Sequence, residues 1–166
     1  MSTFPPADPL PGDAHVGGDG TGLESDLRFL QRVTFGASYH DRAMMEALGR
    51  DAYLEWQLAY ESIDVSALEA ELVARYPWLT LSAAEMVAHW IEEIDIGHAE
   101  VTITRALKSP RQLYERVVEM WNDHFNITSS GLTMAWTRAV DEREVIRAHA
   151  MGKFRDLLGA SARSPA

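Results

Sequence analysis

The spacing of apolar side chains predicts that the chain folds into short helices from Leu23 onward. Large apolar residues recur there at intervals of three and four, which places them on one face of an α-helix. No stretch shows the strict apolar and polar alternation of a half-buried strand, and no internal repeat is evident. We therefore expect an all-α, irregular multi-helix domain of about eight short helices.

Glycines and helix-capping patterns divide the first half of this domain. Gly36 and Gly49 stand where the first two helices would end, and a third is expected near residues 50–60. The spacing Ser-x-x-Glu occurs at Ser66 and again at Ser82; it is typical of a helix start, where hydroxyl and carboxylate satisfy free backbone donors. Helices are therefore expected near 67–75 and 83–94, with another near 98–107.

The second half begins at Ser109 and Pro110, which suit the N-cap and the first residue of a helix. This helix is expected to run to about Phe125. A break at residues 129–131 comes before an amphipathic segment over 132–140. Two last helices are predicted near 141–149 and 153–162.

Residues 1–22 differ from the rest of the chain. They hold many Pro and Gly residues and almost no large apolar side chains, so they cannot bury enough apolar surface to offset the entropy of ordering. We interpret them as a disordered leader before a helical domain at 23–166. The leader also lacks the basic start and the apolar stretch of a secretory signal, so the chain as written is expected in the cytoplasm.

Composition narrows the possible partners. With 166 residues and 46% hydrophobic content, the chain can form a sizeable core. The formal net charge of −10 argues against nucleic acid, which is bound mainly through phosphate neutralisation by basic residues. The absence of Cys excludes a disulfide scaffold and a thiolate site, and no apolar run is long enough for a membrane span. A metal would need His and carboxylate ligands, and no cofactor is evident.

His124 is the first candidate functional residue. It shares a helix face with Val117, Met120 and Trp121, so the ring is expected to point inward. A buried imidazole more often accepts or donates a structural hydrogen bond than it serves catalysis or a metal, and both roles stay open here. The neighbouring Asp123 is a candidate partner in either case. Glu115, Glu119 and Asp123 also form an acidic row, which is expected on a solvated face.

A second polar stretch runs over residues 141–158. Arg143 and Arg147 are four residues apart and so share a helix face, on which they can lock neighbouring helices through carboxylates or bind an anionic ligand. The carboxylates considered for the lock are Asp123 and Asp141, and Glu144 lies three residues before Arg147. His149 is expected near a helix end, with helix capping as its ordinary role and ligand binding as the alternative.

Other candidates for chemistry are weaker. Glu85, His89 and Glu92 stand in line on one helix face and could hold a divalent ion, although that face lies opposite the apolar stripe and is expected in solvent. Asp95 and His98 are separated by Gly97 and are expected in a loop. No nucleophile elbow, zinc-protease motif, phosphate loop or di-iron helix motif is present, so no well-marked enzyme class is indicated.

Several motifs in a fixed order suggest a family. They are Arg32–Gly36, Ala47–Leu58, Ser109–Arg116, Trp121–Ile127 and Asp141–Leu158. Together they resemble the bacterial domain-of-unknown-function family number 1800, over about residues 23–166. The resemblance implies a largely helical protein, often exported, with no established activity. It also implies a Pro before His149, where this chain has Ala148, so the local backbone shape can differ.

Members of that family continue past the position of Ala166, into a motif rich in Asn, Glu, Arg and His. The resemblance therefore implies that this chain is a truncated N-terminal part. The last helix would then carry an exposed apolar side, formed by Phe154, Leu157, Leu158 and Ala162, whose partner is the missing C-terminal part or another protein chain.

Two hypotheses of function follow. The first is a structural or interaction module without independent catalysis, held by a polar lock of His124, Asp123, Arg143, Arg147 and His149. The second is the N-terminal part of an enzyme of unknown substrate, either metal-dependent or metal-free, in which His124, Asp123 and His149 supply metal ligands or acid–base groups.

Overall fold

A computed structural model describes residues 21–127, 134–164 and 166 of the chain, and these residues form helices and turns without a strand. The expected all-α fold is confirmed. The predicted leader at 1–22 lies outside the described residues, apart from Thr21 and Gly22 at the start of the first helix. The elements are α1 (Thr21–Val33), α2 (Tyr39–Leu48), α3 (Arg50–Leu58), η1 (Tyr60–Ser62), α4 (Ser66–Arg75), η2 (Pro77–Thr80), α5 (Ala83–Met86), α6 (Ile91–Lys108), α7 (Gln112–Phe125), α8 (Met134–Asp141), the π-helical η3 (Glu142–Ile146), α9 (Arg147–His149) and α10 (Phe154–Ser161).

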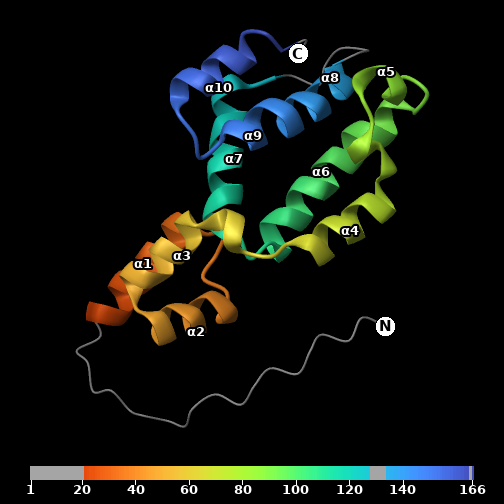
Figure 1. The fold of residues 1–166 in the computed structure, drawn as a ribbon. Helices are drawn as coiled ribbons and strands as arrows, with labels where there is room; N and C mark the ends of the chain where they lie inside the picture. Colours follow the sequence, from red (N-terminus) through yellow and green to blue (C-terminus); the bar gives the residue numbers. More distant parts are fainter. Residues whose placement is uncertain (1–20, 128–133, 165) are drawn as a thin grey trace.

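Helices α1, α2 and α3 form a small group at one end of the molecule (Figure 1). Leu30, Met45 and Tyr53 make its buried core. Gly49 separates α2 from α3 with a φ of 83°, a backbone conformation that L side chains rarely adopt, which explains a glycine at the predicted stop. The Tyr53 hydroxyl donates a hydrogen bond of 2.9 Å to the buried Asp41, which fastens α3 to the start of α2.

Two buried glutamines connect this group to the start of α7. Gln57 accepts a hydrogen bond from the Leu113 backbone at 3.1 Å and donates one to the carbonyl oxygen of Pro110 at 2.9 Å. Gln112 accepts from the Phe35 backbone at 3.0 Å. A buried amide whose donors and acceptor are all used fixes the relative position of two elements. The N-terminal group is therefore held to α7 by polar contacts as well as by packing.

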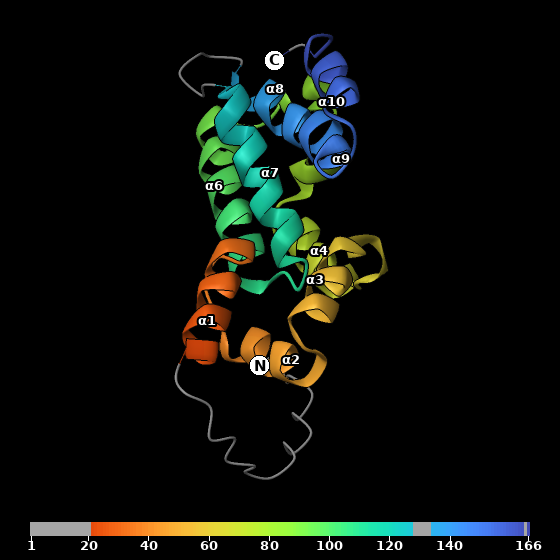
Figure 2. The same ribbon diagram turned by 90° about the vertical axis from the view of Figure 1, so that its left-hand side faces the viewer.

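The second group packs around Trp78, which is almost completely buried. Its core comes from α4, η2, α5, α6 and α8, and α4 runs beside α6 (Figures 1 and 2). Gly97 on α6 allows this packing, because a Cβ at that position would lie 3.0 Å from the Trp78 ring. The close approach of ring and backbone requires glycine inside an otherwise regular helix.

The third group joins α7 to the segment after α8 and to α10. Tyr114, Val118, Ile146 and Leu157 lie in its core. The Trp121 indole donates a hydrogen bond of 3.0 Å to the carbonyl oxygen of Ala150. The two polar stretches singled out in the sequence, 121–127 and 141–158, therefore do meet in the fold.

The helical path from α8 through η3 to α9 is continuous, with π-helical turns over Glu142–Ile146. Such a π segment inserts an extra residue into a helix and occurs often at functional sites, where it redirects side chains. Here it carries Glu142 and Arg143, both of which face the cavity described below. The sequence predicted a separate helix near 141–149 after the amphipathic segment over 132–140, and not this continuous path.

The predicted bounds were wrong around α5 and α6. A helix at 83–94 and another at 98–107 were expected, whereas α5 ends at Met86 and α6 runs unbroken over Ile91–Lys108. Gly97 was read as an interruption, but the neighbouring Trp78 fills the space beside it and the helix continues. His98 consequently lies on a buried helix face and not in a loop.

The two Ser-x-x-Glu patterns behave differently. At Ser82 the side chain accepts from the Glu85 backbone and the Glu85 carboxylate accepts from the Ser82 backbone, so the capping box is formed. At Ser66 the box is not formed, because Ser66 is itself the first residue of α4. The Asp64 side chain accepts a hydrogen bond of 2.9 Å from the Ser66 backbone, and Glu69 pairs with Arg105 on α6. Helix α4 still begins near the predicted position.

None of the helices among residues 21–127, 134–164 and 166 has the length and apolar character required to cross a membrane.

Candidate functional site

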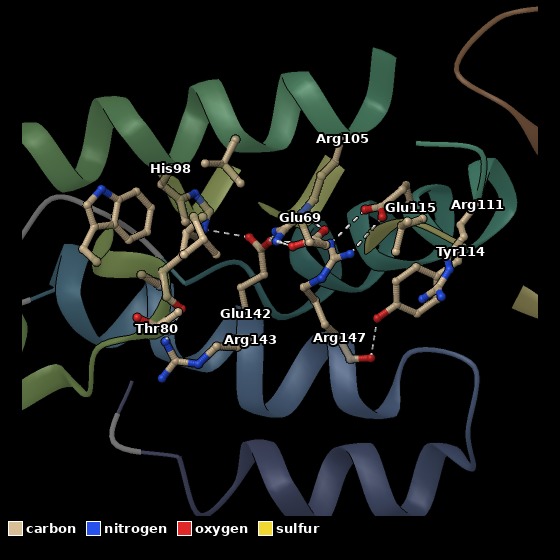
Figure 3. A pocket seen from close by; sticks show the side chains of 16 residues that line it. Glu69, Thr80, His98, Arg105, Arg111, Tyr114, Glu115, Glu142, Arg143 and Arg147 are labelled. Carbon is tan, nitrogen blue, oxygen red and sulfur yellow. Dashed lines mark hydrogen bonds and ion pairs between the residues drawn. The ribbon is translucent and has the colours of Figure 1, made fainter. Parts of the chain in front are cut away.

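A buried network of charged side chains lies between the second and third helix groups. Six side chains form it: Glu69 from α4, His98 and Arg105 from α6, Glu115 from α7, Glu142 from η3 and Arg147 from α9. Arg105 follows His98 by seven residues, so both side chains project from the same face of α6. Figure 3 shows these side chains converging from both sides on Glu142.

Glu142 occupies the centre and is almost wholly buried. Its Oε2 lies 2.7 Å from His98 Nε2. Its Oε1 lies 3.8 Å from Arg105 Nη1 and 3.9 Å from Arg147 Nη1, beyond direct hydrogen-bond distance. One carboxylate therefore interacts with three basic side chains at once, in contact with the imidazole and at longer range with the two guanidinium groups.

Arg105 and Arg147 each also form a bidentate contact with a second carboxylate. Arg147 donates two hydrogen bonds of 2.8 Å to Glu115, and Arg105 donates two, of 3.0 and 2.7 Å, to Glu69. The planar guanidinium matches a carboxylate in this geometry, which makes such contacts both strong and directional. The Tyr114 hydroxyl adds a hydrogen bond of 2.7 Å to the carbonyl oxygen of Arg147.

The surroundings keep the central groups charged. Burial alone would raise the pKa of Glu142, but the interaction with His98 and the charges of Arg147 and Arg105 outweigh it and hold the pKa at about 2. Burial would likewise lower the pKa of Arg147, yet its hydrogen bonds and charge attraction to Glu115 raise it. For Glu69, the effect of burial is again outweighed, and Arg105 lowers the pKa. Glu142, Arg147 and Glu69 are therefore charged at neutral pH.

A cavity of about 360 Å³ opens beside this network. Its polar wall holds all six network residues together with Arg111 and Arg143, and its apolar wall includes Val73, Trp78 and Val101. Arg111 donates to the carbonyl oxygen of Ile63, and Arg143 donates to those of Leu79 and Leu81. Concave sites with a few convergent polar groups on an apolar background are typical of ligand sites.

The expectation that His124 points inward is wrong. Both Asp123 and His124 are exposed, and the His124 ring packs edge-on against Trp121 and Phe125. The buried side chains of α7 are Gln112, Tyr114, Glu115 and Val118, so the inward face is turned from the predicted one, and Met120 is 50% exposed. The reason is that Glu115 takes an inward position once Arg147 neutralises it.

The structure does bring together the two predicted arginines, Arg143 and Arg147, which line the same cavity. Their partners differ from the predicted ones, because Glu115 and Glu142 take the place of Asp123 and Asp141. Glu144 is exposed and accepts a hydrogen bond from Arg143 at 2.7 Å.

Two further candidates lie away from the network. His149 is half-buried, and its Nδ1 lies 2.8 Å from the carbonyl oxygen of Val145 in its own helix. Asp141 is buried and lines a separate, smaller cavity together with Asp123. The structure thus does not gather His124, Asp123 and His149 with the two arginines in a single site.

The sequence did not identify Arg105 and Glu142 as candidates, and it assigned other roles to Glu69, His98 and Glu115: a helix cap, a loop residue and a solvated acidic row. One signal was available on α6, where Ile94, His98, Val101 and Arg105 recur at helical spacing and so predict a shared inward face. Gly97 hid that signal. No comparable signal existed for Glu115, because its burial depends on Arg147, which is 32 residues away in sequence.

No group of three or more His, Asp or Glu side chains suited to hold a metal ion is found in the part of the chain that the structure describes. The line of Glu85, His89 and Glu92 is broken by the turn after α5. Glu85 caps its own helix, and His89 lies 3.8 Å from Glu93.

Comparison with known proteins gives one match. No curated protein and no solved structure matches the chain. A family model described as "Protein of unknown function (DUF1800)" matches residues 28–166, which include every helix from α2 to α10 and every residue of the buried network. The chain belongs to this family of proteins of unknown function.

Proposed function

We propose that the described helices form a structural module without catalysis of its own, in which the buried ion network locks the second and third helix groups together. The observation that carries this proposal is the bidentate pairing of Arg147 with Glu115 beside the central Glu142. Each arginine of the network donates two hydrogen bonds to one protein carboxylate. A site occupied in this way resembles a structural lock more than an exposed catalytic centre.

The network constrains the fold because the loss of one of its charged members is costly. A buried ion pair contributes little relative to an apolar pair of similar shape, but removing one partner leaves an uncompensated charge and costs about 3–5 kcal/mol. In this protein the charges come from five helical elements, α4, α6, α7, η3 and α9. Any movement that separates those segments would leave buried charges unpaired at a similar cost in free energy. The network therefore favours a single arrangement of helices.

The pH dependence of stability tests the proposal. The pKa of Glu142 is lowered from 4.5 to about 2 in the fold, so its ionised form stabilises the protein above about pH 4.5, and this stabilisation is lost as the pH falls from 4.5 toward 2. Urea unfolding of the wild type and of Glu142→Gln, measured from pH 2 to pH 7, should show the two stabilities converging at the acid end. A constant difference over the whole range would refute the role of this carboxylate.

An enzyme is the second candidate, and the contact of 2.7 Å between His98 and Glu142 beside a cavity favours it. A carboxylate that orients an imidazole is a common arrangement for general acid–base catalysis. A panel of ester, amide and phosphate substrates tests this candidate with wild type and His98→Gln. Turnover that disappears in His98→Gln while the protein stays folded would support the enzyme and contradict a purely structural module.

The interaction surface of the module is proposed to lie on α10. Leu157 is 1% exposed and packs inward, whereas Phe154 and Leu158 on the same helix are 51% and 47% exposed. Covering such residues stabilises a complex in proportion to the apolar area buried. The proposed occupant is a helix from a further part of the protein or from another chain. Phe154→Ser and Leu158→Ser together should abolish an association that sedimentation velocity detects in the wild type.

A further inference from the structure

The charge of the cavity lining differs from that of the chain. Four arginines and three glutamates line the cavity, whereas the whole chain has 15 basic and 25 acidic residues. The lining therefore carries one excess positive charge, and a proton on His98 would add another. A concave surface with one sign of charge and low-dielectric walls concentrates ions of the opposite sign.

The excess charge can be assigned to particular residues. Arg105 and Arg147 are matched by Glu69 and Glu115. Arg111 donates its hydrogen bonds to the carbonyl oxygen of Ile63 and has no carboxylate at ion-pair distance among the described residues, although its charge also acts on Glu69 and Asp64. Arg143 is similar, since it donates to two carbonyl oxygens and reaches one carboxylate, that of Glu144, which is exposed and outside the lining. Figure 3 shows Arg143 at the His98 end of the cavity and Arg111 at the Tyr114 end.

Unused hydrogen-bond donors point the same way. Arg111 and Arg105 each donate hydrogen bonds through Nε and Nη2, and Nη1 of Arg105 lies 3.8 Å from Glu142 Oε1, too far for a hydrogen bond. The buried Nδ1 of His98 has no hydrogen-bond partner among the described residues, and it donates or accepts according to its tautomer. A guanidinium group carries five N–H donors, so both arginines can donate further hydrogen bonds to an acceptor in the cavity.

The remaining wall determines what else the ligand must offer. Val73, Trp78 and Val101 line the cavity with apolar surface. The volume of about 360 Å³ lies at the lower end of the range for small-molecule sites. An inorganic ion would leave this apolar wall uncovered, whereas a compact organic group would cover it.

We infer that this cavity is a binding site for a small organic anion, whose carboxylate or phosphate oxygens accept hydrogen bonds from Arg111 and Arg105 and whose apolar part lies against Trp78 and Val101. The π-helical turn places Arg143 at the other end of the same cavity, where its charge adds to the attraction. His98, Arg105 and Arg147 remain the counter-charges of Glu142. The negative charge of the ligand is balanced by Arg111 and Arg143, which have no ion-pair partner in the cavity lining. This inference does not depend on the structural lock proposed above.

Three probes of nearly equal size test the charge requirement: benzoate, phenyl phosphate and the neutral benzamide. Isothermal titration calorimetry and thermal shift at constant ionic strength should show saturable binding of one benzoate or one phenyl phosphate per chain, and a raised Tm. The stronger of the two identifies the anionic group. Benzamide should leave the Tm unchanged. Equal binding of benzamide, or no saturable binding of either anion up to about 10 mM, would overturn the inference.

Variants locate the site. Arg111→Gln should weaken binding of the anion about tenfold or more, because a hydrogen bond to a charged group is lost. Val73→Phe should block binding by filling the half-buried edge of the cavity without changing its charge. Arg75→Gln is the matched control, since Arg75 pairs with Glu100 on the surface and does not line the cavity.

The variants also separate the two proposals. Circular dichroism melts of Arg111→Gln and Val73→Phe establish that each is folded. If both are folded and bind the anion as tightly as wild type, the cavity is not the site. If a variant loses anion binding but melts at the same temperature as the wild type, the cavity binds the anion and the proposed structural module is unaffected.

Discussion

The pairing of Arg147 with Glu115 gives the sharpest prediction of stability. The two side chains are 15% and 7% exposed and share two hydrogen bonds of 2.8 Å. Replacing Arg147 with Met leaves Glu115 buried without a counter-charge, and this should lower the free energy of unfolding by about 3 kcal/mol, at the lower end of the range because the site is not fully buried. Replacing Glu115 with Leu should lower the free energy of unfolding by a similar amount, because it leaves the positive charge of Arg147 buried without this carboxylate partner.

The double variant distinguishes a lock from two unrelated side chains. Once one partner is gone, removing the other also removes the uncompensated buried charge, so the double variant should be more stable than either single variant and close to the wild type. The coupling energy of the cycle is then at least about 3 kcal/mol. Urea unfolding followed by circular dichroism measures each corner of the cycle, provided that the m-value stays constant.

An exposed pair in the same protein provides the control. Lys108 and Glu71 lie 2.7 Å apart, almost the same distance, but their side chains are 52% and 57% exposed. Solvent screening should reduce their coupling energy to about 0.2–1 kcal/mol. If the Arg147 and Glu115 cycle gives no larger coupling than this surface pair, the argument from burial is refuted.

Three smaller predictions follow from local structure. Ser82→Ala should lower the Tm by about 3 °C through loss of the helix cap, whereas Ser66→Ala should leave it unchanged because no cap is formed there; equal shifts in thermal melts would contradict the assignment. Gly97→Ala should destabilise the fold by about 1 kcal/mol in urea unfolding, since crowding of Trp78 outweighs the better helix propensity of Ala, and a stabilised variant would show that the ring can move. Burial, together with the nearby charge of Glu142, raises the pKa of Asp141, whose carboxylate oxygens have no hydrogen-bond partner among the described residues, so its ionised form is unfavourable in the fold. Asp141→Asn should therefore stabilise the protein at pH 7, with the gain absent below about pH 3.8 in the same unfolding assay, and a destabilised variant at pH 7 would reverse the argument.

The helices were predictable where short-range signals decide them. Gly49 ends α2 because its φ of 83° favours glycine, and Ser82 begins α5 because its side chain and that of Glu85 satisfy local backbone groups. The end of α7 at Phe125 also agrees with its predicted position, and Asn126 follows it with a φ of 46°, in the left-handed region that Asn tolerates. Each of these signals involves residues within one helical turn.

The buried network was not predictable in the same way. Glu115 had the same acidic neighbours as Glu119, yet the first pairs with Arg147 in the interior and the second with Arg116 near the surface. The difference lies in a contact between elements that are distant in sequence, which periodicity cannot register. The sequence indicated Arg147 as a locking residue because it shares a helix face with Arg143. Its partner Glu115 was identified only from the structure.

Hydrogen exchange tests the central claim most directly, because it reports on each helix separately. In Arg147→Met, amide protection should fall together in α4, α6, α7 and residues 142–149, while the amides of α1, α2 and α3 should lose much less. Such a result would mean that one side chain couples the helices that supply the network. Loss of protection confined to residues 142–149 would contradict the account, since Arg147 would then stabilise only its own helix.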